Sequence, residues 1–110
     1  MAFIQIVEFK SSRDDELQKL DSEWTEAERQ DSTVQRATLA RDRDNPNSYV
    51  MIVEFPSYEE AMKNSNRPET DAFAARLAAL CDGPINYRNL DVDRQTVVLP
   101  SEAARTSSNR

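Results

Sequence analysis

Three parts of the sequence carry side chains that could bind and orient a small molecule. Trp24, the only tryptophan, offers a large ring and an indole N–H donor. The segment from Asn64 to Arg67 places four polar side chains where two helices are predicted to meet. Free backbone N–H groups at such a junction can bind a carboxylate, a phenolate or another oxyanion. Tyr87 could add a phenolic hydrogen bond inside an apolar cavity.

Each of these residues also has a purely structural explanation. Trp24 could be a core anchor whose indole N–H binds a backbone carbonyl, and the segment from Asn64 to Arg67 could be a cap and a hinge. Tyr87 and Arg88 point to opposite sheet faces, so at most one of them can line a pocket directly. Tyr87 is the better candidate because of its phenolic donor. In the functional interpretation, one pocket between a helix and the sheet is lined by Trp24, Asn64, Asn66, Arg67 and Tyr87.

The sequence contains no histidine, and Cys81 is its only cysteine. This composition excludes Ser-His-Asp and Cys-His catalysis within one chain, proximal-His haem ligation and histidine-containing zinc sites. Asp82, Asp91 and Asp93 lack the spacing of a metal-binding loop. Cys81 ends an apolar helix stripe, where a small buried hydrophobic residue is expected. The composition does not exclude chemistry that uses carboxylates, tyrosine, arginine or a bound cofactor, but we predict no metal and no other cofactor.

Charge and composition limit the partners. The formal net charge is -6, from 20 acidic against 14 basic residues, and no basic run could neutralise several phosphates, which argues against nucleic acid. The longest apolar stretch, 2–9, is too short to span a bilayer, and no secretory signal pattern is visible, so we expect a cytoplasmic protein without a membrane anchor. The length of 110 residues suits one domain, predicted over 1–100, with a disordered polar tail over 101–110.

Four segments are predicted to be the strands that position the candidate residues. Dense β-branched and aromatic residues or an apolar alternation mark them at 3–9, 33–43, 49–55 and 85–92. The second and third should pair as a hairpin across a turn at 44–48. The third reads as a strand buried on both faces. Residues 95–99 could extend the last strand or pair elsewhere.

Helices are predicted between the first two strands and between the last two. Apolar residues at three- and four-residue spacing, including Trp24, predict a helix over 13–30. Ser57 and Glu60 have the spacing of a capping box that opens a short helix ending at 63. Asn66, with Pro68 and Glu69 after it, is predicted to cap a further helix. The apolar stripe of that helix is Phe73, Leu77, Leu80 and Cys81.

The order β-α-β-β-α-β predicts an α+β domain of ferredoxin-like topology, an antiparallel sheet with helices on one face. The other face would carry Ile4, Ile6, Val50 and Ile52 or their alternating neighbours, and periodicity alone does not decide between the two sets. Either set would expose an apolar patch of roughly hundreds of Å². Pairing of two sheets face to face would cover it, so we predict a homodimer.

The segment from Val53 through Phe73 resembles the dimeric α/β-barrel superfamily, in particular the antibiotic biosynthesis monooxygenase-like group. The resemblance rests on a short helix, a polar break, Pro68 and a following amphipathic helix, and with the first strand and helix it extends to about Val92. It implies two ferredoxin-like sheets paired into a dimeric barrel. Some members of the group oxidise polycyclic aromatic substrates with dioxygen and without metal or flavin. Relatives of the same fold degrade haem, isomerise small lactones or have no known activity.

One position departs from that resemblance. Many members of the group carry a histidine a few residues before the proline that corresponds to Pro68, whereas this sequence has Asn64. The difference argues against haem degradation. Two function classes therefore remain: a cofactor-independent monooxygenase-like enzyme for a small aromatic or polyketide-like molecule, and a non-catalytic dimeric module that binds a ligand or regulates a partner.

Overall fold

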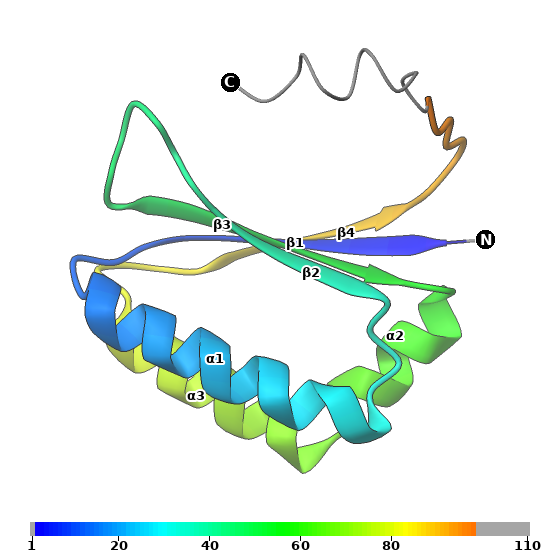
Figure 1. The fold of residues 1–110 in the computed structure, drawn as a ribbon, viewed down its shortest axis with the longest axis horizontal. Coiled ribbons are helices and arrows are strands. Elements are labelled where there is room, and N and C mark those ends of the chain that lie inside the picture. The colour runs from blue at the N-terminus through cyan, green and yellow to red at the C-terminus, as the bar shows by residue number, and fades with distance from the viewer. Residues whose placement is uncertain (1, 99–110) are drawn as a thin grey trace, which may run out of the picture.

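The computed structural model describes residues 2–98, except for the side chains of residues 27–31. Seven elements follow one another as β1 (Phe3–Lys10), α1 (Asp14–Asp31), β2 (Arg36–Arg41), β3 (Ser48–Phe55), α2 (Tyr58–Ser65), α3 (Pro68–Leu80) and β4 (Asn86–Asp91). The strands form one antiparallel sheet in the order β2-β3-β1-β4, and the helices cover one face (Figure 1). This is the predicted ferredoxin-like fold. The predicted tail lies outside the described residues.

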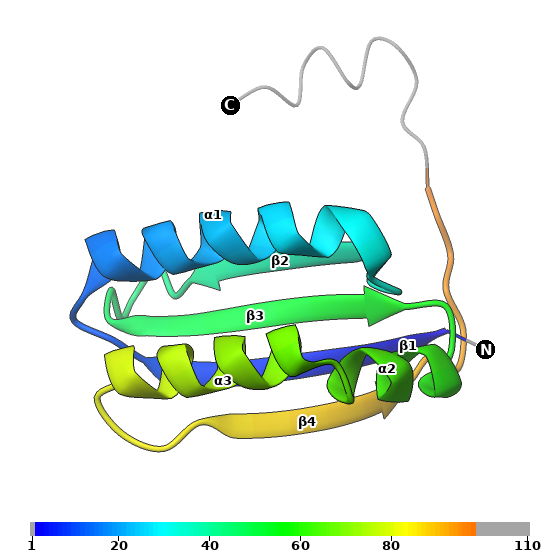
Figure 2. The same cartoon turned by 90° about the horizontal axis from the view of Figure 1, so that it is seen from below.

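The sheet register decides which residues face the helices. In the central pair of strands, Phe3 lies opposite Phe55 and Val7 lies opposite Met51. These four side chains are all buried. The odd-numbered residues of β1 and β3 therefore form the sheet side of the core, and α1 and α3 lie side by side above them (Figure 2).

The even-numbered residues of β1 and β3 face away from the helices. Ile4, Ile6, Val50 and Ile52 are only half-buried, and exposed Leu90 of β4 lies opposite Ile4. The prediction that β3 is buried on both faces is thus wrong for the single chain, because nothing in the described residues covers this side of the sheet. We call this surface the outer sheet face.

The capping box predicted at Ser57 is confirmed, since its Oγ accepts a hydrogen bond from the backbone N–H of Glu60 at 3.1 Å. The predicted cap at Asn66 is wrong. Asn66 is instead the C-cap of α2, and its backbone N–H binds the carbonyl oxygens of Met62 and Asn64. Pro68 occupies the first turn of α3, which makes Arg67 the N-cap.

A polar cluster ties the start of α1 to the hairpin of β2 and β3. The hydroxyl of Tyr49 donates to Asp14 Oδ1 at 2.8 Å and accepts from Arg41 at 2.9 Å, and Arg41 also pairs with Asp14. These bonds hold the pKa of Asp14 below its ordinary value, with the hydrogen bond from Tyr49 as the main cause. The ring of Tyr49 stacks on the buried ring of Phe9, so the cluster also packs against the hydrophobic core.

Candidate functional site

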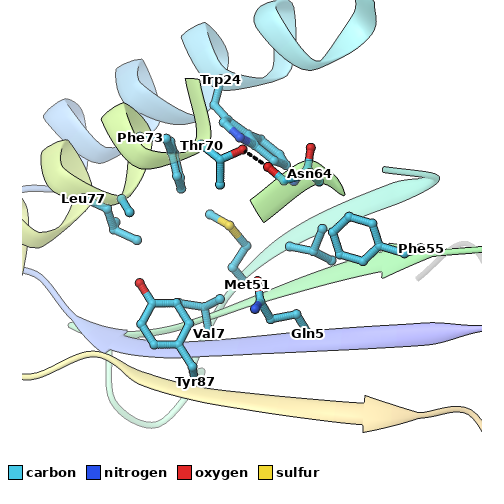
Figure 3. A pocket seen from close by; sticks show the side chains of 12 residues that line it. Gln5, Val7, Trp24, Met51, Phe55, Asn64, Thr70, Phe73, Leu77 and Tyr87 are labelled. Atoms are coloured by element: carbon cyan, nitrogen blue, oxygen red, sulfur yellow. Dashed lines mark hydrogen bonds between the residues drawn. The ribbon is translucent and has the colours of Figure 1, made fainter. Parts of the chain in front are cut away.

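A cavity of about 70 Å³ lies between the helices and the sheet (Figure 3). The helices contribute Trp24, Asn64, Thr70, Phe73, Ala74 and Leu77. The sheet contributes Gln5, Val7, Met51, Val53, Phe55 and Tyr87. Most of the lining is therefore apolar, with a few polar groups at its edges.

The structure brings together three of the five residues predicted from the sequence. Trp24, Asn64 and Tyr87 line the cavity although they come from α1, α2 and β4. Asn66 does not line it, because it caps α2 and is exposed to solvent. Arg67 does not line it either. Its side chain is only 16% exposed and donates a hydrogen bond to Oδ1 of Asn64.

Asn64 is a buried polar side chain, 5% exposed, whose orientation is fixed by its neighbours. Its Oδ1 accepts hydrogen bonds from the guanidinium of Arg67 at 3.2 Å and from Ser32 Oγ at 3.4 Å. Because a guanidinium can only donate, this contact identifies the oxygen of the carboxamide. The opposite atom, Nδ2, has no acceptor in the described part of the chain. Asn64 therefore presents a buried N–H donor that is free to bind a ligand.

Trp24 presents a second such donor. The residue is 8% exposed, and its ring packs against Phe73 with 5.3 Å between centroids. The expected hydrogen bond from the indole N–H to a backbone carbonyl is absent: within 2–98, Trp24 Nε1 has no acceptor. The prediction of that bond is wrong, and the ring instead lines the cavity. Buried N–H groups without partners are costly, so a ligand oxygen here would be favoured.

Two further polar residues line the cavity but already have partners. Thr70 Oγ1 donates to the backbone carbonyl of Asn64 at 2.6 Å, which fastens α3 to the end of α2. Gln5 Nε2 donates to Asn89 Oδ1 at 3.2 Å. The sequence analysis did not single out either residue. Gln5 does carry a signal, since it interrupts the core-facing series of Phe3, Val7 and Phe9, but only the register identifies that series as core-facing.

Tyr87 forms the exposed side of the cavity. It lies on the edge strand β4 and is 49% exposed. Partial burial, together with the neighbouring Cys81, raises the pKa of its phenol, so the hydroxyl stays protonated and can donate. Burial and Asp82 raise the pKa of the Cys81 thiol, which makes this cysteine a poor nucleophile.

Apart from Tyr87, no ionisable side chain lines the cavity among residues 2–26 and 32–98, whose side chains the structure describes. The same residues contain no group of three or more side chains that could hold a metal ion. None of the described helices is long and apolar enough to cross a membrane. The cavity can therefore offer an apolar, aromatic surface and two buried N–H donors, which suits an uncharged ring that carries an oxygen or its anion.

Comparison with known proteins shows the fold. No protein-family model and no curated protein matches the chain. Among solved structures, it is similar to SnoaB, a cofactor-independent oxygenase from Streptomyces nogalater, with 22% identity over 87% of this chain and 96% of SnoaB and a TM-score of 0.74. Rv0793 from Mycobacterium tuberculosis is 15% identical over 88% of this chain and all of its own, with a TM-score of 0.75.

A further similar structure is described as an antibiotic biosynthesis monooxygenase. It is 18% identical over 86% of this chain and its entire own chain, with a TM-score of 0.71. These likenesses show that the chain has the fold of antibiotic biosynthesis monooxygenases, as predicted from the sequence.

Proposed function

We propose that this protein is a cofactor-independent monooxygenase that binds the anion of a small aromatic or polyketide-like molecule. One observation carries the proposal: Trp24 and Asn64 are both buried, both line one cavity, and their side-chain N–H donors have no acceptor in the described chain. The fold adds support, because SnoaB, which shares it, is a cofactor-independent oxygenase.

Two N–H donors in an apolar cavity favour the ionised form of a phenol or enol. A hydrogen bond to a charged group contributes about 1.5–3 kcal/mol, roughly twice as much as one between neutral groups. The donors are already fixed in position, so little reorganisation is needed when the charge develops. The bound substrate would therefore ionise at a lower pH than it does in water.

The substrate anion itself would supply the electrons for the reaction with dioxygen. A ring carbon of the anion forms a bond to one oxygen atom and gives a hydroperoxide. Loss of water then breaks the O–O bond, leaves the first oxygen as a carbonyl and releases the second in the water molecule. For a phenol with a free para carbon, phenol and dioxygen yield a quinone and water. No other reductant takes part.

Dioxygen uptake tests the proposal. The protein is mixed with electron-rich phenols that have an unsubstituted para carbon, and oxygen consumption and product mass are followed with isotope-labelled dioxygen. We expect a quinone that carries one labelled oxygen atom. The proposal would be contradicted if phenols that are shown to bind consumed dioxygen no faster with the protein than in a protein-free control.

One observation favours the alternative, a ligand-binding module without catalysis. The described lining of the cavity has no carboxylate or lysine that could remove a proton from the substrate, and the sequence has no histidine. A catalytic site would thus depend on substrates that ionise readily or on water as the base. Tight binding of phenols without oxygen consumption would identify the protein as such a module.

We also propose that the protein works as a homodimer paired through the outer sheet face. The apolar side chains of Ile4, Ile6, Val50 and Ile52 gather there, and no residue that the structure describes covers them. The same face holds Arg88, which has no ion-pair partner in the described chain, and Glu8, so its charges can complement those of a second copy. Burial of this face in a pair of sheets would remove the apolar patch from water.

A further inference from the structure

We infer that Met51 sets the size of the ligand and restricts the cavity to a single aromatic ring. This inference rests on the proposed function, since it specifies which phenols the same cavity admits. Met51 extends from the middle of β3 into the centre of the cavity, below Trp24 and Thr70 (Figure 3). Its side chain is 2% exposed, so it takes up space that a ligand would otherwise fill.

The volume of the cavity argues against polycyclic ligands. It measures about 70 Å³, whereas a cavity that binds benzene has about 150 Å³, and pockets for drug-sized molecules have about 300–1,000 Å³. A single ring therefore needs the displacement of one side chain. A ligand with three or four fused rings would need several core residues to move together.

The walls of the cavity differ in how readily they can move. Val53, Phe55 and Leu77 are at most 5% exposed and belong to the main core. Trp24 is packed on Phe73. Met51 belongs to the same core, but its unbranched thioether with three rotatable bonds adapts its shape at low cost. Its displacement is thus the easiest way to admit one ring. The other apolar side chains of the described lining are branched, aromatic or too small to free room for a second ring, and Gln5 is held by its hydrogen bond to Asn89.

The positions of the N–H donors and of Tyr87 also determine how a bound phenol ring would be oriented. The donors of Trp24 and Asn64 lie on the helix side of the cavity, and Tyr87 lies on the far side from Asn64, at the edge strand (Figure 3). A phenol oxygen bound by the two donors would leave the para carbon directed toward the sheet and Tyr87. The half-exposed tyrosine is on the side from which the ligand and dioxygen can enter.

The inference is tested by calorimetric titration of the protein with phenols of increasing size. The probes are para-cresol with one ring, beta-naphthol with two and a hydroxyanthracene with three. We expect the wild-type protein to bind para-cresol at least tenfold more tightly than either larger phenol. Met51→Ala should bring beta-naphthol to the affinity of para-cresol or better, whereas Met51→Leu, which nearly conserves volume, should keep the wild-type order.

Equal or tighter binding of the larger phenols to the wild-type protein would overturn the inference, and so would a failure to bind any of the three. The wild-type series decides the question even where Met51→Ala does not fold. Oxygen uptake is measured separately. A protein that binds one-ring phenols selectively and consumes no dioxygen would retain the size limit and lose the proposed activity.

Discussion

The guanidinium of Arg67 donates a hydrogen bond to Oδ1 of Asn64, 3.2 Å away, and so determines which end of the carboxamide is left without a partner. Arg67 itself lies behind the cavity wall, where it also pairs with Glu69. Its positive charge near the site favours a bound anion as well. Arg67 is therefore a positioning residue in the proposed site.

Substitution of Arg67 should change the ionisation of a bound phenol. In Arg67→Met, the carboxamide loses its charged donor, and we expect the affinity for para-nitrophenolate to fall by about tenfold. The pKa of the bound phenol, followed by its absorbance, should rise. Arg67→Lys should restore most of both values, because it keeps a charged donor. Equal values for the Met variant and the wild type would show that Arg67 does not orient the donor.

Asn64 and Asn66 form a matched pair of variants. Asn64→Ala removes the buried donor, so para-nitrophenolate should bind about 10- to 100-fold more weakly, and the free energy of unfolding should fall by about 1–3 kcal/mol. Asn66→Ala alters an exposed cap outside the cavity, and its effect on stability should stay below about 0.5 kcal/mol. Its affinity for the phenolate should not change. Equal losses of affinity in both variants would argue against the site.

The Asp14 cluster predicts a loss of stability in acid. The pKa of Asp14 lies below its ordinary value of 3.8, chiefly because of Tyr49, so its contribution is complete above that value and disappears as the pH falls through the lowered pKa. Tyr49→Phe should be less stable than the wild type at neutral pH. The difference should shrink in acid, as measured by urea unfolding at several pH values. A difference that is independent of pH would contradict this account.

The contribution of Asp14 must be separated from that of other carboxylates. Arg36 lowers the pKa of Glu54 and Arg76 lowers that of Glu23, so both contribute stability in the same acid range. Comparison of Tyr49→Phe with the wild type cancels these contributions, because both chains retain them.

The outer sheet face predicts how the chain associates. Ile52→Lys places a charge in the middle of the apolar patch, and we expect a dimeric wild type to become monomeric in sedimentation measurements. Ala75→Lys is the control, since Ala75 is exposed on α3, on the other side of the molecule. A monomeric wild type at micromolar concentration, or dissociation of the control alone, would contradict pairing through this face.

The sequence predicted the order of elements because each has a strong local signal. The Ser57 capping box and the apolar runs of β1 and β3 are determined by neighbouring residues, and the structure confirms them. Local patterns could not tell which face of β3 meets the helices. That choice depends on the register between β1 and β3, which is a contact between distant segments.

The same dependence on contacts between distant segments explains why only part of the candidate site was predicted. Trp24, Asn64 and Tyr87 were chosen for their chemistry, and they line one cavity; that they bind a ligand stays a prediction. Met51 was missed because a methionine in a strand has no special local pattern. Gln5 was missed because only the register shows that it interrupts a core-facing series. The role of Arg67 was missed because its contact with Asn64 depends on how Asn66 ends α2 and Pro68 starts α3.

The cavity and the outer sheet face lie on opposite sides of one sheet. In the dimer that we propose, the two cavities would thus be separated by two packed sheets, whose backbones lie about 10 Å apart. The described lining residues all lie on the helix side of the sheet, away from the face that we propose to pair. Ligand titration should therefore follow a simple hyperbola with one site per chain and no cooperativity, and a mixed dimer with one Asn64→Ala subunit should retain half of the binding capacity at full affinity.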